Sequence, residues 1–439
     1  MFRNFISKKY SVYIIGIVYS ILFFYGYIVF LEPNYGYAGF AIIPERMDMP
    51  WLGFFTYILV LVPLFFYSGI NFISSFISIF IYYILYIPIL FTLFLNMPFS
   101  VPDVVRVEIL FCISMSLLFC ADKIKFSTYL ILPSRINVYK LVYILTILCT
   151  VYMLFVYRNS LRLVSFADVY DLRSSNDELG GNFFTAYLSS WLSNAFIPLT
   201  FVYGLFASKR LYVWVATFAC LVIYMATAGK SVILFPLFMY GLYQILKRVN
   251  LNGSFFAIGA ALIGIMLFTL LIDLNVFIGA VFWMRTLGNG GLLANYYYQF
   301  FSENPTTYYS HINFVNAITH SYPYGDVPLG RVIGLEYWGE TNSNASFWAT
   351  DGIAAMGEIG ILFSSVILFF IFIFFNRVSK GYNKVFLILV LVPFINSLLN
   401  MSLFTSMLTG GGFVIFLVLM FSSSVNNKYI NENFNNSWR

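Results

Sequence analysis

The sequence predicts an all-α fold of the polytopic membrane class, and three properties carry this prediction. The chain has 439 residues, of which 61% are hydrophobic and only 10% are charged. Soluble domains carry roughly 25% charged residues, so this chain has too few charges to cover a water-facing surface. Twelve apolar stretches follow one another, and the lysines and arginines gather on one side of them. We therefore expect about twelve transmembrane helices in a single integral-membrane domain, residues 1–439.

The apolar stretches define the expected spans. A helix needs about 20 apolar residues to cross the roughly 30 Å hydrocarbon core, and several of the stretches are shorter than this. The expected spans are residues 10–31, 51–70, 72–95, 104–121, 139–157, 183–207, 211–228, 231–246, 254–272, 353–375, 385–400 and 408–425. The stretches 211–228 and 231–246, which Gly229 and Lys230 join, also fit an incomplete or re-entrant hairpin.

The orientation follows from the lysines and arginines in short loops, which mark the cytoplasmic side of a membrane protein. With a cytoplasmic N-terminus, sixteen of the 24 basic residues lie inside and sixteen of the 18 acidic residues lie outside. An even number of spans then places both termini in the cytoplasm. The net charge of +6 is a result of this topology, so we expect a lipid bilayer and no nucleic acid among the partners.

Neither a metal site nor a cofactor site is expected. The four cysteines, Cys112, Cys120, Cys149 and Cys220, fall within expected spans and lack metal-ligand spacing. Small, apolar packing is the ordinary role of such buried thiols. No histidine or carboxylate cluster has the spacing of a metal site.

Two outward loops, residues 158–182 and 273–352, hold most of the polar residues that could do chemistry. The first loop carries Arg158, Arg162 and Arg173, which one continuous helix would place within about 60° of each other. An arginine can direct two donors at one phosphate, so we expect the three to bind a lipid diphosphate. Pairing with the four acidic residues of the same loop is the alternative.

Lys230 stands in the string ATAGKS between two apolar stretches. It is not part of a nucleotide-binding P-loop, because the first glycine of that motif is missing. A lone cation at the membrane edge is costly unless it is paired or extends to the interface. Phosphate binding and extension to the outer interface both remain open for this residue.

The second loop combines aromatic residues with carboxylates. Aromatic rings can stack on sugars, and Tyr297, Tyr298, Trp338 and Trp348 are the candidates for glycan binding; an interfacial aromatic belt is the alternative.

Asp351 and Glu358 are seven residues apart, so a continuous helix would place them on one face. Either is a candidate general base, and helix-dipole complementation is the alternative for Glu358. His311 and His320 are the only histidines; His311 is the reserve candidate for the base.

Three strings and the topology resemble the O-antigen polymerase (Wzy-type) family, within the O-antigen polymerase/ligase superfamily of bacterial membrane glycosyltransferases. The strings are VYDLR at 169–173, TAGKS at 227–231 and NASFWATDGIAAMGEIGIL at 344–362. The resemblance implies a GT-C-like fold in the bacterial cytoplasmic (inner) membrane, with the active site facing the periplasm. Ligase-like members carry a histidine just before the third string, whereas this chain has Ser343 and Asn344, which argues against transfer onto lipid A core.

The implied reaction polymerises O-antigen or capsule-type repeat units. A glycan passes from undecaprenyl diphosphate to the non-reducing end of a lipid-linked repeat unit, and a chain-length regulator is an implied partner. Arg158, Arg162, Arg173, Lys230 and Arg285 would bind the diphosphate, while Glu358, Asp351 or His311 would be the base. The alternative function is a lipid-linked oligosaccharide flippase, which we expect to show internal repeats and charges at the membrane midplane.

Overall fold

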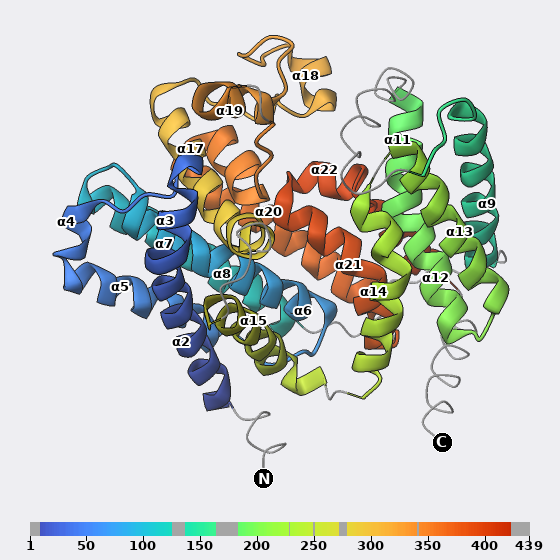
Figure 1. Cartoon of the computed structure of the whole chain (residues 1–439), viewed down its shortest axis with the longest axis horizontal. Helices are drawn as coiled ribbons and strands as arrows, with labels where there is room; N and C mark the ends of the chain where they lie inside the picture. Colours follow the sequence, from blue (N-terminus) through green and yellow to red (C-terminus); the bar gives the residue numbers. More distant parts are fainter. Residues whose placement is uncertain are drawn as a thin grey trace. The chain divides into compact units, whose positions relative to one another are not determined.

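The computed structural model describes residues 9–124, 137–163, 183–227, 229–248, 251–271, 279–339 and 342–422. Every regular element in these ranges is a helix (Figure 1). Seven helical segments are long and apolar enough to cross a membrane: Tyr10–Ala38, Ile73–Asn96, Val101–Lys123, Val138–Val156, Arg210–Thr227, Ser254–Leu271 and Trp348–Ser379. Four shorter apolar helices accompany them: Pro50–Phe65, Val232–Leu246, Lys384–Asn400 and Gly412–Phe421. The all-α membrane class is confirmed, while the twelve spans and the two outward loops stay predictions.

The chain divides into two compact units. The first comprises Met1–Lys125, Asn250–Phe374 and Leu398–Phe404; the second comprises Phe126–Val249, Phe375–Ser397 and Thr405–Arg439. The prediction of a single integral-membrane domain is not decided by this division. The division matters for the candidate functional site, because the residues predicted for that site fall in both units.

The helices of the first unit begin with α2 and end in α20. Their bounds are α2 (Lys9–Gly26), η1 (Tyr27–Leu31), α3 (Glu32–Tyr35), η2 (Gly36–Ala38), α4 (Pro44–Met47), α5 (Pro50–Leu61), η3 (Val62–Phe65), α6 (Ile73–Phe80), η4 (Ile81–Tyr86), α7 (Ile87–Asn96), α8 (Val101–Cys120), η5 (Ala121–Lys123), η7 (Leu251–Gly253), α15 (Ser254–Leu271), η8 (Ala280–Gly288), α17 (Asn289–Glu303), α18 (Asn313–Thr319), α19 (Leu329–Trp338), η9 (Trp348–Ile353) and α20 (Ala354–Ser379). The end of α20 belongs to the second unit.

The second unit contains α9 (Val138–Val156), α11 (Phe183–Trp191), η6 (Leu192–Phe196), α12 (Ile197–Phe206), α13 (Arg210–Thr227), α14 (Lys230–Leu246) and α23 (Gly412–Phe421). Most of α21 (Lys384–Asn400) and of α22 (Leu403–Leu408) lies in it as well. Tyr139 of α9 and Tyr203 of α12 stack with ring centroids 4.4 Å apart. The Thr146 and Thr200 hydroxyls of the same two helices are 2.8 Å apart, so rings and hydroxyls together fix this helix pair.

Tyrosines fill much of the core of the first unit, and backbone carbonyl oxygens accept hydrogen bonds from several of their hydroxyls. Tyr19 donates to the carbonyl oxygen of Tyr83 at 2.7 Å, and Tyr86 donates to that of Leu59 at 2.7 Å. A buried phenol hydroxyl without a partner is costly. These bonds let a helix bundle bury tyrosine, which supplies large apolar contact area, at little polar cost.

One glycine, Gly291, sets the position of α17 against α7. A Cβ atom on Gly291 would lie 2.7 Å from the carbonyl oxygen of Pro88 and would also meet the side chain of Thr92. Only glycine permits this approach of the two backbones. The close packing brings the following residues of α17, including the buried Tyr297, against the rest of the unit, and it positions the site described next.

Candidate functional site

The two candidate carboxylates lie on either side of a break in one helical segment. Asp351 belongs to the π-helix η9, and Glu358 lies near the start of α20. Between them, Met356 (φ −145°, ψ 20°) and Gly357 (φ 61°, ψ −142°) have non-helical backbones. Positive φ at this position favours glycine. The expectation that one continuous helix holds both carboxylates on one face is therefore wrong, because the chain turns between them.

Glu358 forms a forked ion pair with Arg106 of α8. The Nε of Arg106 donates to Oε2 of Glu358 at 2.7 Å, and its Nη2 donates to Oε1 at 2.7 Å. The hydroxyl of Tyr298, on α17, also donates to Oε1. The side chains of Arg106 and Glu358 are 54% and 27% exposed, so a molecule outside the bundle can reach this cluster.

The start of α8 holds Arg106 in place. Ser100 precedes the helix, and its hydroxyl donates to Asp103. Asp103 in turn accepts a bond of 2.8 Å from Nη2 of Arg106, one helical turn later. On the other side, the ring of Phe99 meets the ring of Tyr298 edge-on at 5.1 Å. Asp103 of α8 thus holds the guanidinium of Arg106, and Tyr298 of α17 holds the carboxylate of Glu358.

Asp351 is fully buried and pairs with a histidine. Its Oδ1 lies 3.5 Å from Nε2 of His311, and the backbone N–H of Leu403 donates to its Oδ2 at 2.5 Å. The hydroxyl of Thr307 donates to the carbonyl oxygen of Ala354 at 3.1 Å and lies 2.8 Å from Nδ1 of His311. Thr307 thus holds the Nδ1 side of the ring, and the Nε2 side faces Oδ1 of Asp351 without a hydrogen bond.

The turn that carries His311 is tied to the break in the helix. The N–H groups of Thr307 and Tyr308 donate to the carbonyl oxygens of Ala354 and Ala355 at 2.8 and 3.0 Å. Tyr308 and Tyr309 have φ of 45° and 66°, in the left-handed region that non-glycine residues seldom adopt. Two such residues in succession mark a conformation that its surroundings impose. Here the imposed turn directs His311 at Asp351.

The phenols around the two carboxylates are held in their protonated form. Burial, and next the hydrogen bond to Glu358 and its charge, raise the pKa of Tyr298. Burial and the charge of Asp351 likewise raise the pKa of Tyr309. Both hydroxyls therefore stay protonated near neutral pH, and that of Tyr298 donates to Glu358.

The predicted diphosphate residues fall in different parts of the chain. Arg285 lies in η8 of the first unit and is exposed. Arg158 and Arg162 lie in the second unit and are exposed, with the guanidinium of Arg158 4.8 Å from the ring centroid of Phe155. Because α9 ends at Val156 and turns follow, the expectation that Arg158 and Arg162 align on a continuous helix is wrong.

Two further predicted residues are described in part or not at all. Lys230 is the first residue of α14, and its backbone alone is described. Arg173 lies outside the described residues. The structure thus joins neither of them to Arg285, Arg158 or Arg162.

Burial divides the four aromatic candidates for glycan binding. Tyr297 and Trp348 are completely buried, the first bonded to the carbonyl oxygen of Ser343 and the second to the hydroxyl of Ser365. No ring face of these two is open to a sugar in this conformation. Tyr298 belongs to the Glu358 cluster, and Trp338 is half-buried.

Trp338 belongs to an aromatic group at the surface of the first unit. The ring of Tyr296 lies 4.2 Å from that of Tyr337 and 4.8 Å from that of Trp338, centroid to centroid. The indole of Trp338 donates to the carbonyl oxygen of Ala38 at 3.0 Å. These three partly exposed rings are the better candidates for stacking on a sugar.

Sequence reasoning named both carboxylates and His311 but missed Arg106 and Thr307. The one available signal for Arg106 was its position, since it is an arginine on the expected outer side, against the usual charge rule. Thr307 gave no signal, because its role depends on a turn that only the fold reveals.

Comparison with protein-family models, with curated proteins and with solved structures finds no match to this chain. The resemblance to O-antigen polymerases therefore rests on the strings and the topology quoted above.

Proposed function

We propose that this protein is a membrane glycosyltransferase that polymerises oligosaccharide repeat units carried on undecaprenyl diphosphate. The fork between Arg106 and Glu358, with Tyr298 bonded to the same carboxylate, is the observation that carries the proposal. It combines a carboxylate, a permanent cation and a phenol donor in a cluster that is partly exposed. Transfer from a diphosphate-linked sugar uses a base, cations and hydrogen-bond donors of this kind.

Glu358 keeps room for an acceptor hydroxyl. A carboxylate offers about four acceptor positions, of which Arg106 and Tyr298 occupy two on Oε1 and one on Oε2. The acceptor hydroxyl would bond to the remaining position on Oε2 and pass its proton there. Its oxygen would then form the bond to the anomeric carbon of the donor, and the diphosphate would leave with the electron pair of the bond that breaks.

The cations assigned to the leaving diphosphate are those the resemblance implies. Arg285 lies in the same unit as Glu358, and Arg158, Arg162, Arg173 and Lys230 remain proposed diphosphate ligands from the second unit. Asp351 with His311 is the alternative base; because the pair is buried, it requires an opening of the turn at Tyr308 and Tyr309 before a sugar can reach it.

The proposed setting is the bacterial cytoplasmic membrane, with both termini in the cytoplasm and the site facing the periplasm. The seven long apolar helices support a membrane-embedded protein, and the charge distribution supports the orientation. The lipid-linked repeat unit is the substrate in this proposal, and a separate chain-length regulator is a proposed partner.

A deletion strain tests the proposal. Cells without the protein are expected to accumulate single lipid-linked repeats and to lack long polymer, while the wild-type gene restores the polymer ladder. Glu358→Gln should fail to restore it. Glu336→Gln, a matched change at an exposed glutamate of the same unit, should restore it fully. Long polymer in the deletion strain, or in cells with Glu358→Gln, would rule out this function for the site.

One observation favours the flippase as a second candidate. Glu108, in the long apolar helix α8, is completely buried, and both of its carboxylate oxygens lie within 3.2 Å of the Thr56 hydroxyl. A buried carboxylate within a membrane helix is typical of transporters. A flippase would leave repeat units solely on the cytoplasmic face of the deletion strain, whereas a polymerase would leave them on the periplasmic face.

A further inference from the structure

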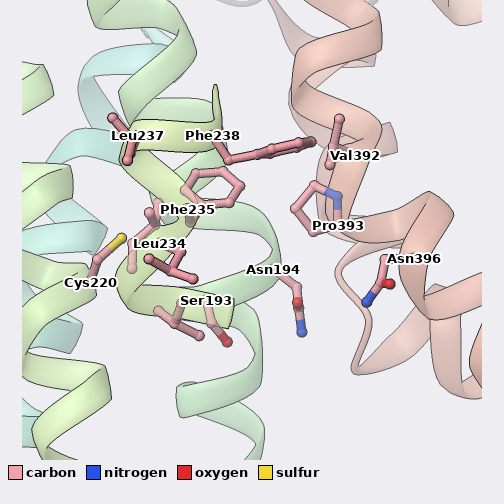
Figure 2. Close-up of a pocket in the computed structure, with 12 residues that line it drawn as sticks. Ser193, Asn194, Cys220, Leu234, Phe235, Leu237, Phe238, Val392, Pro393 and Asn396 are labelled. Atoms are coloured by element: carbon pink, nitrogen blue, oxygen red, sulfur yellow. The ribbon is translucent and has the colours of Figure 1, made fainter. Parts of the chain in front are cut away.

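The second unit contains a cavity whose described lining residues include none of the predicted site residues. Its volume is about 630 Å³, within the roughly 300–1,000 Å³ range of ligand pockets. Its walls come from η6 and the start of α12, from α13, from α14 and from α21 (Figure 2). All of these residues belong to the second unit, so the cavity is a property of that unit alone.

One end of the cavity is made of hydrocarbon side chains. Phe238 of α14 points toward Val392 of α21 (Figure 2), and Leu237 of α14 also lines the cavity. Leu237 is 75% exposed and Phe238 is 56% exposed. Both belong to Val232–Leu246, one of the shorter apolar helices. Large apolar side chains exposed on an apolar helix face lipid in a membrane protein, so this end of the cavity is accessible to a hydrocarbon chain.

The other end is polar. Asn194 of η6 and Asn396 of α21 extend into the gap between their elements, with Ser193 beside them (Figure 2). Asn194 donates through Nδ2 to the hydroxyl of Ser190 at 3.3 Å. These side chains make this end of the cavity polar, so a ligand's polar part would lie there.

The polar end is also the N-terminal end of α14. In Figure 2, Leu234 lies nearer Asn194 than Leu237 and Phe238 do, so α14 runs with its first residue, Lys230, toward that end. At 1.5 Å per residue, Lys230 is about 12 Å along the axis from Phe238. A helix N-terminus attracts anions through its free N–H groups and its dipole. Along the cavity, hydrocarbon thus gives way to amides and then to the N-terminus of α14.

We propose that this cavity holds the hydrocarbon chain of a polyprenyl phosphate lipid, with the phosphate directed at the start of α14. The identity of the lipid rests on the proposed function. The graded lining complements an anionic amphiphile, and we assign the volume of about 630 Å³ to one hydrocarbon chain. A phospholipid of the bilayer has two chains on one glycerol, so the second would remain outside.

Photolabelling tests this proposal. The purified full chain in phospholipid vesicles would be irradiated with a polyprenyl phosphate that carries a diazirine in its first isoprene units, then digested and analysed by mass spectrometry. We expect label on peptides of α14 and α21, lost on addition of unlabelled undecaprenyl phosphate but not of excess phosphatidylglycerol. Label that phosphatidylglycerol displaces equally well would assign the cavity to ordinary bilayer lipid and overturn the proposal.

Variants of the lining residues test whether the label comes from this cavity. Leu237→Trp should fill the hydrocarbon end and reduce labelling at least fivefold, while Leu148→Trp, a matched leucine of α9 that is 58% exposed, should leave it unchanged. Asn194→Leu, which removes an amide from the polar end of the cavity, should also reduce labelling. Undiminished labelling in both cavity variants would overturn the proposal; the competition experiment with the wild-type chain needs no variant, so a folding defect does not remove the test.

The same vesicles separate this inference from the proposed function. A wild-type chain that is labelled in the cavity but extends no glycan would remove the polymerase proposal and support the lipid site. A wild-type chain that extends glycans while the cavity stays unlabelled would overturn the lipid site alone.

Discussion

Arg106 and Glu358 lie 252 residues apart in the sequence, yet two hydrogen bonds of 2.7 Å join the guanidinium of one to the carboxylate of the other. The pair links the start of α8 to the start of α20, and Tyr298 of α17 completes it. Because both side chains are partly exposed, the pair adds little to stability. Exposed ion pairs contribute about 0–1 kcal/mol.

Removing the carboxylate should therefore affect activity far more than folding. Glu358→Gln is expected to lower glycan extension at least hundredfold, since a general base contributes about 10²–10⁴ in rate. The free energy of unfolding should change by less than about 1 kcal/mol. Extension rates and thermal unfolding of the purified protein measure the two effects, with Glu336→Gln as control.

A charge exchange separates a chemical role of this pair from a structural one. Arg106→Glu combined with Glu358→Arg restores an ion pair between the same elements but moves the carboxylate to the other helix. We expect both single variants and the double variant to be inactive, and the double variant to unfold like the wild type. An active double variant would mean that the pair only joins α8 to α20.

The buried pair of Asp351 and His311 should behave in the opposite way. Asp351→Ala leaves the N–H of Leu403 without its acceptor, and an unsatisfied buried donor costs about 1–3 kcal/mol. We expect a lower midpoint of thermal unfolding for Asp351→Ala and for His311→Asn. His320→Asn is the control, because His320 is exposed and has a φ of 48°, which asparagine tolerates. Equal midpoints for His311→Asn and His320→Asn would contradict the assigned contacts.

The break between the carboxylates depends on glycines. A Cβ atom on Gly360 would fall on the carbonyl oxygen of Gly352, so Gly360→Ala should move η9 relative to α20, destabilise the protein and reduce glycan extension. Gly264→Ala is the control: nothing lies within 4 Å of its added Cβ, and alanine is the better helix former by about 1 kcal/mol. Thermal unfolding of both variants should shift in opposite directions.

The alkaline limit of stability should depend on Tyr298. Burial and then Glu358 raise its pKa in the folded state, whereas the unfolded chain titrates near about 10. The stability contributed by the protonated phenol is fully present below that pH and is lost as the pH rises toward the folded pKa. Tyr298→Phe should therefore lose less stability than wild type above about pH 10. Tyr37→Phe, at a side chain that is 81% exposed, should follow the wild-type curve; identical curves for all three would contradict the burial of Tyr298.

Much of the fold was predictable because hydropathy and charge are local properties of a sequence. Apolar length identified Ile73–Asn96, Val101–Lys123 and Ser254–Leu271 as helices long enough to span. The break before Glu358 was not predictable, since glycine also occurs within helices and the positive φ of Gly357 is seen only in the folded chain. By contrast, the end of α9 at Val156 agrees with the expected span 139–157, because the apolar run itself ends there.

The site was predictable residue by residue but not as an arrangement. Asp351, Glu358 and His311 stood out because ionisable residues are rare in this chain. Their partners, Arg106 for Glu358 and Thr307 for His311, come from elements whose proximity depends on tertiary packing. The aromatic candidates show the same limit, since Trp348 is buried and Trp338 is not, although the two look alike in sequence.

The most direct test of the central claim is glycan extension by the purified protein in vesicles that contain the undecaprenyl diphosphate-linked repeat unit. The account predicts a ladder of polymers and free undecaprenyl diphosphate from the wild type, and single repeats only from Glu358→Gln. Failure of the folded wild type to lengthen the repeat, or equal ladders from both proteins, would contradict it.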